Sequence, residues 1–167
     1  KEYLPLMVNS RKLFLILGNM NHAIIREIFG YFKENKVWLG YNSGHFWFRV
    51  PNHYEHKKTD FKIDETGQKW RRMGNICWFT NMDIEKRHEF LDLYKSYSPE
   101  EYPHYDQYDA INVNKTMDIP DNYNGVMGVP ITFLDKYSPD QFKMIGVDRY
   151  VEDNPSYGHR FTIEGKE

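Results

Sequence analysis

The run LFLILG, residues 13–18, is an unbroken apolar segment that ends on a glycine. Such a run is typical of a strand buried on both faces, as in a parallel sheet covered by helices. A helix is predicted next, over residues 22–35, with Asn21 as its cap. Its apolar side chains recur at steps of three and four residues, at Ile24, Ile25, Ile28, Phe29 and Phe32. A buried strand, a short loop and an amphipathic helix form half of a βαβ unit, so the predicted fold class is α/β.

The segments that follow alternate between short strand patterns and one more helix pattern. Residues 37–41 and 45–50 predict strands joined by a tight turn at Asn-Ser-Gly. A strand, a turn and a longer strand are predicted between residues 61 and 80. The apolar spacing of residues 90–97 predicts a second helix across residues 84–97. DAINVN and GVMGVPITFLD are the remaining strand candidates.

Composition limits the class of protein. The 167 residues can form one domain or part of one. With 28% charged residues and a mean hydropathy of -0.76, and without an apolar run near the roughly 20 residues that a membrane helix needs, the chain is expected to be soluble. A single cysteine fits a reducing cytoplasm. Because the chain opens on Lys1 inside an apolar pattern, we expect a fragment of a longer protein.

Positive charge is concentrated in one region, although the formal net charge is -2. Between residues 45 and 72 the chain carries seven lysines and arginines against four acids, with aromatic rings interleaved. In the stretch KWRRMGN, residues 69–75, an arginine could lie against phosphate while Trp70 covers a sugar or base. The alternative is a hairpin edge whose exposed charges deter strand pairing between molecules.

The stretch GNICWFTN, residues 74–81, places two large rings between asparagines. In a strand, Phe79 shares a face with Cys77, and Trp78 lies on the opposite face, so one ring is expected in the core and the other can face a site. Asn19 and Asn21, in GNMN, follow the carboxyl end of the first strand, where ligands bind in open α/β sheets. In the alternative reading Gly18 makes the turn and Asn21 only caps the helix.

The histidines do not predict a metal site. His45, His53 and His56 could offer imidazoles, but a structural zinc site needs four ligands and Cys77 is the single thiol. We therefore expect solvated loop histidines and no bound metal.

Several motifs resemble the carboxyl-terminal half of the EcoRI-type adenine-specific DNA methyltransferases. They are KLFLILGNMNHAIIREIF, ENKVWLGYN, RRMGNICWFTNMD followed by KRHEFLDLYKSY, and NGVMGVPITFLDKYSPDQFKMIG, in the right order over most of residues 3–147. The resemblance implies a partial Rossmann-like sheet with flanking helices and an inserted β-hairpin region. It also implies methyl transfer from S-adenosylmethionine to the N6 of adenine in double-stranded DNA, in a restriction-modification system.

The chain departs from that family at its catalytic element. The Asn-Pro-Pro-Phe motif that receives the amine protons is absent from the 167 residues, as is the glycine-bearing loop that cradles the cofactor. In the family this motif lies just upstream of a segment like KEYLPLMV, so we expect most of the cofactor site to lie outside the chain, which would not catalyse alone. The implied division is a single partial domain, with residues 1–44 and 73–97 as methyltransferase core, 45–72 as a basic aromatic insertion, and 98–167 as an extension on the DNA side.

The resemblance adds a target-adenine pocket to the strand-end and DNA-binding residues that the patterns above predict. The residues expected at the target-adenine pocket are Trp78, Phe79, Asn75 and Asn81, and those at the strand-end site are Asn19 and Asn21. The residues expected to bind DNA are Lys57, Lys58, Lys69, Trp70, Arg71 and Arg72. The alternatives are a non-catalytic nucleic-acid-binding module, which would bind DNA without any cofactor effect, and a structural domain whose rings are all core.

Overall fold

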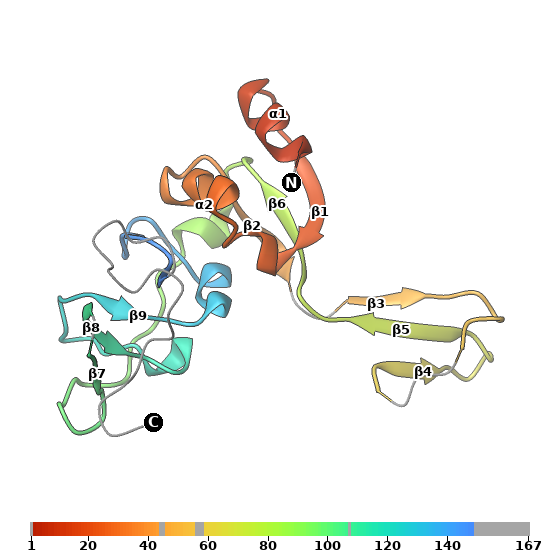
Figure 1. Cartoon of the computed structure of the whole chain (residues 1–167). Helices are drawn as coiled ribbons and strands as arrows, with labels where there is room; N and C mark the ends of the chain where they lie inside the picture. The colour runs from red at the N-terminus through yellow and green to blue at the C-terminus, as the bar shows by residue number, and fades with distance from the viewer. Residues whose placement is uncertain (1, 44–45, 56–58, 107, 149–167) are drawn as a thin grey trace.

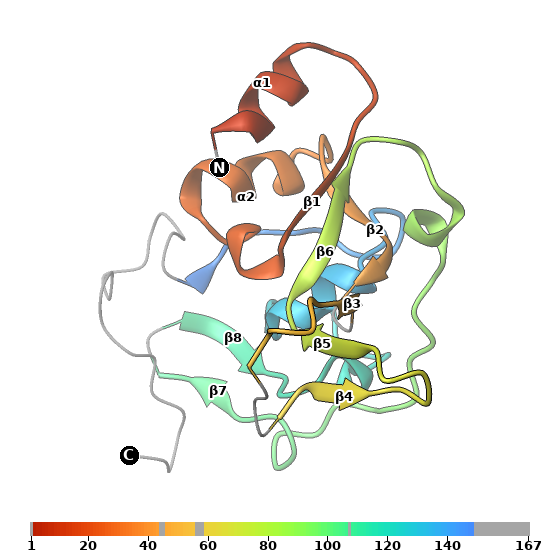
Figure 2. The ribbon, with the colours of Figure 1, turned by 90° about the vertical axis from the view of Figure 1, so that its right-hand side faces the viewer.

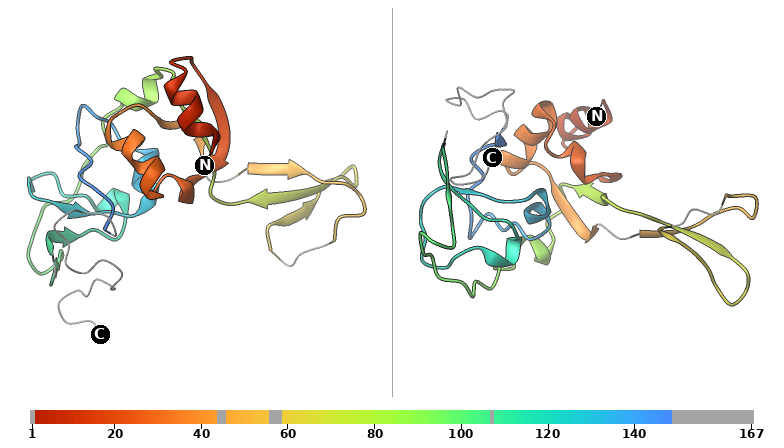
Figure 3. Two further views of the ribbon diagram at one scale, coloured as in Figure 1. Left: turned by 45° about the horizontal axis from the view of Figure 1, so that its top comes forward. Right: turned by 60° about the horizontal axis from the view of Figure 1, so that its bottom comes forward.

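The computed structural model describes residues 2–43, 46–55, 59–106 and 108–148. These residues form a mixed α/β structure with three small sheets of three strands each. The strand orders are β1-β6-β2, β3-β5-β4 and β7-β8-β9. Figures 1 and 3 show that the second sheet projects away from the rest of the molecule. We call the β1-β6-β2 sheet the body sheet and the β3-β5-β4 sheet the arm.

The body sheet joins three strands that are far apart in the sequence. They are β1 (Leu15–Asn19), β6 (Ile76–Thr80) and β2 (Trp38–Ser43). Both β1 and β2 run antiparallel to β6. The helical elements beside the sheet are α1 (Tyr3–Asn9), the short 3₁₀ helix η1 (Met20–His22) and α2 (Arg26–Lys33). The arrangement is seen from two directions in Figures 1 and 2.

The first hydrophobic core lies between one face of the body sheet and the helices. Phe79 and Cys77 of β6 face it, and Phe32 of α2 meets the Phe79 ring edge-on, with ring centroids 5.6 Å apart. Burial raises the pKa of the Cys77 thiol to about 12, so the thiol stays protonated at neutral pH. The cysteine is therefore a small apolar core residue here.

Three expectations for the first strand and helix are wrong. The strand is not buried on both faces, because Leu15 and Leu17 are 52% and 46% exposed on the side away from the core. The helix is confined to Arg26–Lys33, since η1 takes up the residues after the strand. Asn21 does not cap α2, which begins after Ile25 without a side-chain cap. Asn19 instead caps η1, where its Oδ1 accepts from the Asn21 backbone N–H at 2.9 Å.

The predicted turn between residues 41 and 45 does not build a hairpin. Strand β2 pairs with β6, whereas β3 (Phe46–Arg49) pairs with β5 (Lys69–Met73), so the two neighbouring strands belong to different sheets. The expected partnership fails because each strand finds its partner more than twenty residues away in the sequence. The remaining strand of the arm is β4 (Phe61–Ile63).

The second predicted helix is also wrong. Only η2 (Glu85–His88) is helical, and residues 90–97 form neither helix nor strand apart from a bridge between Lys95 and Pro120. In this segment Leu91, Leu93 and Tyr97 pack against the second core while Phe90 and Tyr94 are exposed. Buried and exposed side chains therefore alternate with a period of two residues, which is that of an extended chain.

The second core is built around the third sheet. Its strands are β7 (His104–Tyr105), β8 (Tyr108–Asn112) and β9 (Met127–Gly128), and two further 3₁₀ helices are η3 (Thr116–Asp118) and η4 (Ile131–Asp135). Ile111, Val113, Ile119 and Phe133 are buried there. The mixed α/β class is thus confirmed. The Rossmann-like arrangement stays a prediction, because the body sheet is antiparallel throughout the described residues.

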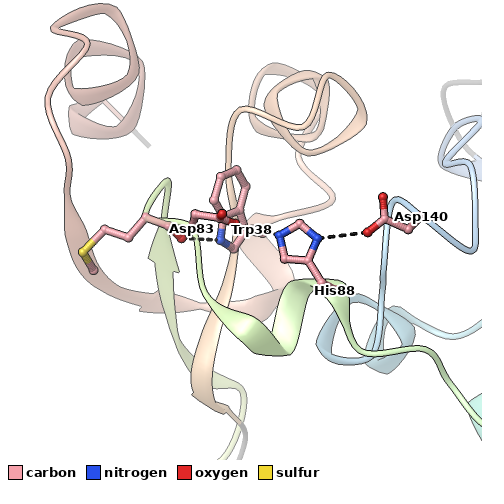
Figure 4. A network of polar contacts seen from close by, with 5 residues as sticks. Trp38, Asp83, His88 and Asp140 are labelled. Atoms are coloured by element: carbon pink, nitrogen blue, oxygen red, sulfur yellow. Dashed lines mark hydrogen bonds and ion pairs between the residues drawn. The ribbon is translucent and has the colours of Figure 1, made fainter.

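His88 of η2 lies between two aspartates from different segments (Figure 4). His88 Nε2 lies 2.8 Å from Asp83 Oδ1, and its Nδ1 lies 2.9 Å from Asp140 Oδ2. Beside it, the Trp38 indole donates to the Met82 carbonyl at 2.9 Å. These contacts hold η2 between β2 and the segment that follows η4.

Replacing His88 by glutamine is expected to destabilise the protein at low pH and to have less effect as pH rises. Hydrogen bonds to Asp140 and Asp83 raise the pKa of His88, because both carboxylates favour the charged ring. The protonated ring therefore contributes stability that is fully present below its unfolded pKa of about 6.5 and is lost as pH rises through the folded value. Unfolding midpoints of the wild type and His88→Gln, compared from about pH 5 to pH 9, should converge at the alkaline end.

The matched control is His53→Gln, which removes an exposed histidine of the arm. The unfolding midpoint of His53→Gln should stay close to that of wild type over this pH range. A gap between wild type and His88→Gln that widens with pH would contradict the proposed contact between imidazolium and carboxylates.

Candidate functional site

One end of the body sheet brings together asparagines from two distant segments. Asn19, at the carboxyl end of β1, pairs with Ile76 at the start of β6, and the Met20 backbone N–H donates to the Asn75 carbonyl at 2.6 Å. Asn75 has a positive φ of 59°, a conformation that asparagine adopts more readily than most residues. Asn19, Asn21 and Asn75 therefore lie at one place, which we call the strand-end site.

Asn81 lies at the opposite end of β6. Its Oδ1 accepts from the Phe14 backbone N–H and its Nδ2 donates to the Lys12 carbonyl, both at 2.9 Å. Thr80 beside it is buried and donates to the Phe14 carbonyl at 2.7 Å. The structure thus separates Asn81 from Asn75, and both polar ends of the Asn81 side chain bind the backbone that leads into β1.

The two rings of GNICWFTN lie on opposite faces of the body sheet, as the alternation predicts. Phe79 pairs with Ile16 and is 5% exposed in the first core. Trp78 pairs with Leu17 on the other face, where Leu17 is half-exposed and Trp78 half-buried. Of the two rings, only Trp78 lies on the face of the sheet that the core does not occupy.

The arm begins at the strand-end site. Strand β5 continues into β6 through Gly74 and Asn75, and Figure 3 shows the arm leaving the body at this end of the sheet. Lys69, Trp70, Arg71 and Arg72, expected to bind DNA, all lie on β5, the central strand of the arm. Lys57 and Lys58 lie outside the described residues.

The far end of the arm is ordered by one carboxylate. Asp64 Oδ1 accepts from the Thr66 backbone and hydroxyl and from the Gln68 backbone, while Oδ2 accepts from the Trp70 indole at 2.8 Å. These hydrogen bonds, led by Thr66 and Trp70, lower the pKa of Asp64 to about 2. The carboxylate therefore stays charged at neutral pH and fixes the orientation of the Trp70 ring.

Sequence reasoning missed two residues that the arm brings together. The Lys62 Nζ lies 4.5 Å from the centre of the Trp47 ring, and Trp47 is 38% exposed. Trp47 is on β3 and Lys62 on β4, so β5 lies between their strands. The alternation in FWFR could have placed Trp47 on a face, but the partner of that face depends on a register that only the folded arm shows.

Other features of the described residues do not add to this site. A cavity of about 260 Å³ lies elsewhere, lined by side chains that include Lys86, Phe90, Tyr94 and Asp135. Within the described ranges, histidine, cysteine and carboxylate side chains form no cluster that could hold a metal ion. His45 and His56 lie outside those ranges. In the same part of the chain, no helix is both long enough and apolar enough to cross a bilayer.

The comparisons with known proteins agree on one family. The family described as "Adenine-specific methyltransferase EcoRI" matches residues 1–165. The chain is 47% identical to Type II methyltransferase M.EcoRI of Escherichia coli, an alignment that covers 99% of this chain and 51% of the relative. No solved structure matches the chain significantly.

Two mycoplasma proteins are also similar. Type II methyltransferase M.MgeORF184P of Mycoplasma genitalium is 38% identical and Type II methyltransferase M.MpnI of Mycoplasma pneumoniae is 34% identical, each over 87% of this chain and 47% of the relative. The chain thus spans about half the length of the curated relatives that it matches. Because the family match extends over nearly all of its residues, the chain belongs to the EcoRI family of adenine-specific methyltransferases.

Proposed function

We propose that the full-length protein carrying this chain transfers a methyl group from S-adenosylmethionine to the N6 of adenine in double-stranded DNA. We propose further that it does so in the cytoplasm, as part of a restriction-modification system. The observation that carries this proposal is the family match over residues 1–165, supported by the named activity of the relatives. The fold adds a strand-end site from which an arm rich in cations and aromatic rings extends.

The body sheet is proposed to be one side of a larger Rossmann-like sheet. Within the described residues β1 pairs with β6 alone, so its other edge has unpaired backbone groups. Leu15 and Leu17 are half-exposed beside that edge, which is unusual for so apolar a strand. Both features are explained if a further strand, from the part of the relatives that this chain does not span, pairs with this edge and packs its side chains beside Leu15 and Leu17.

We propose that the residues of this chain contribute to catalysis by positioning the target adenine. Methyl transfer needs the adenine amine directed at the methyl carbon of the donor, with acceptors for the amine protons. Since the 167 residues hold no Asn-Pro-Pro-Phe element, those acceptors are proposed to lie outside the chain. The Trp78 ring can hold the plane of an adenine extruded from the duplex, by stacking. Asn75 and Asn21 lie at the strand-end site, at the end of β6 where that strand begins.

The described residues do not form a complete site for S-adenosylmethionine. At the carboxyl end of β1 the Asn19 amide oxygen is occupied by the Asn21 backbone. A Cβ at Gly18 would lie 2.7 Å from Phe79, so the backbone there faces the core. The binding site of the methyl donor is therefore proposed to lie mainly in the rest of the longer protein.

An assay of methyl transfer by the full-length protein tests this function. Incubation with unmethylated genomic DNA and labelled S-adenosylmethionine should place the label on adenine as N6-methyladenine, identified by mass spectrometry of the nucleosides. The 167-residue chain alone should transfer none, because it lacks the catalytic element. Label on cytosine would contradict the adenine assignment. DNA binding by the full-length protein without transfer would favour the non-catalytic binding module.

A further inference from the structure

The strand register divides the side chains of the arm between two faces. Directly paired residues of antiparallel strands share a face. Trp47 pairs with Arg72, and Trp70 pairs with both Arg49 and Lys62. One face, which we call the Trp47 face, therefore holds Trp47, Arg49, Lys62, Trp70 and Arg72. The opposite face holds Phe46, Phe48, Phe61, Ile63, Lys69, Arg71 and Met73.

On the opposite face the cations serve the arm itself. The Lys69 Nζ donates to the carbonyls of Asn52 and Tyr54, at 2.5 and 3.2 Å. Arg71 donates to the Thr59 carbonyl at 3.0 Å. These bonds hold both side chains against residues between β3 and β4, with two hydrogen bonds from Lys69 and one from Arg71. The rest of this face is apolar.

On the Trp47 face, cations lie over an exposed ring. The Lys62 ammonium is 4.5 Å and the Arg72 guanidinium 5.9 Å from the centre of the Trp47 ring. Arg72 is paired with Asp60, whereas Lys62 makes no ion pair among the residues that the structure describes. Lys62 is therefore an exposed cation that can neutralise an incoming anion while its stem stays against the ring.

We propose that the Trp47 face of the arm contacts double-stranded DNA, with the Trp47 ring packed on a sugar or base and the Lys62 ammonium on a phosphate. The proposal rests on the proposed function, which supplies DNA as the partner. It differs from the sequence-based expectation, which gave these roles to Trp70 and to a guanidinium of Arg71 or Arg72. In the folded arm Trp70 is held by Asp64, and Arg71 is held by the Thr59 carbonyl. An exposed ring beside an unpaired cation offers both stacking and charge neutralisation at one place.

The test is the affinity of the full-length protein for duplex DNA over a range of salt concentrations. Trp47→Leu should weaken binding about 5- to 150-fold with little change in the salt dependence, because stacking is lost and no charge is removed. Lys62→Gln should weaken binding and reduce the slope of log K against log salt by about 0.9, the value for one phosphate contact.

Two exposed positions provide matched controls. Ile63→Ser alters the neighbour of Lys62 on the opposite face, and Lys33→Gln removes one exposed positive charge from α2. Both should bind DNA as wild type does. Far-UV circular dichroism and the unfolding midpoint check that each variant is folded.

The outcomes separate the two proposals. If the wild type binds and methylates DNA while Trp47→Leu and Lys62→Gln bind equally well, this inference is overturned and the proposed function stands. A larger loss in Ile63→Ser than in Trp47→Leu would place DNA on the opposite face and also overturn it. If folded wild-type protein binds no duplex even at low salt, the proposed function itself fails.

Discussion

Replacing Phe79 by alanine is expected to lower the free energy of unfolding by about 3–5 kcal/mol, the usual cost of removing a large buried ring. The ring is 5% exposed and meets Phe32 edge-on. It also lies directly under Gly18, where a Cβ would come within 2.7 Å of the ring. Because β1, β6 and α2 converge on this ring, the cavity could close only if a strand moved. Urea unfolding of the full-length protein measures the loss.

The matched control is Phe90→Ala, which removes the same side chain from a position that is 63% exposed. Its free energy of unfolding should change by no more than about 0.5 kcal/mol. If Phe79→Ala were as stable as this control and instead lost DNA binding, Phe79 would belong to the adenine pocket rather than to the core.

The local patterns predicted which segments are strands better than they predicted what covers them. The alternation in GNICWFT correctly placed Phe79 and Trp78 on opposite faces, because side-chain direction in a strand follows from the backbone alone. The burial of LFLILG was predicted from apolarity, yet Leu15 and Leu17 are half-exposed. An apolar strand indicates that a face should be covered, but the covering segment is a long-range feature of the fold.

The helix predicted over residues 84–97 failed for a related reason. Phe90, Tyr94 and Tyr97 fit a helical stripe, with steps of four and three residues, whereas Leu91, Leu93 and Tyr97 fit an extended one, with steps of two and four. Leu93 decides between them, because it packs on the second core only in the extended chain. A short apolar pattern cannot distinguish the two periods without knowing where the core lies.

The strand-end site was only half predictable from the sequence. Asn19 could be placed there because it follows a strand directly. Asn75 joins it through the β1–β6 register and the bond from Met20, and Asn81 is carried to the far end of the sheet by that same register. Such pairings join residues more than fifty positions apart, so no local pattern specifies them.

The Trp78 ring gives the most informative prediction about the site itself. Replacing Trp78 by leucine is expected to reduce methyl transfer into unmethylated genomic DNA by about 5- to 150-fold, the loss of one ring that stacks on a base. The free energy of unfolding should change by less than about 1 kcal/mol, because the ring lies on the sheet face opposite the first core, beside half-exposed Leu17. Trp78→Phe, which keeps an aromatic plane, should retain most of the activity.

Substitutions of the two rings of β6 are thus expected to have opposite effects on stability and activity. Phe79→Ala should lose stability and keep its activity per folded molecule, whereas Trp78→Leu should keep stability and lose activity. The alternative is that both rings only fill the interior of the longer protein. It would show as a stability loss in Trp78→Leu of the same size as in Phe79→Ala, with unchanged transfer per folded molecule. Because Trp78 and Phe79 are adjacent on one strand, a difference between them reflects the face of the sheet rather than the position along the chain.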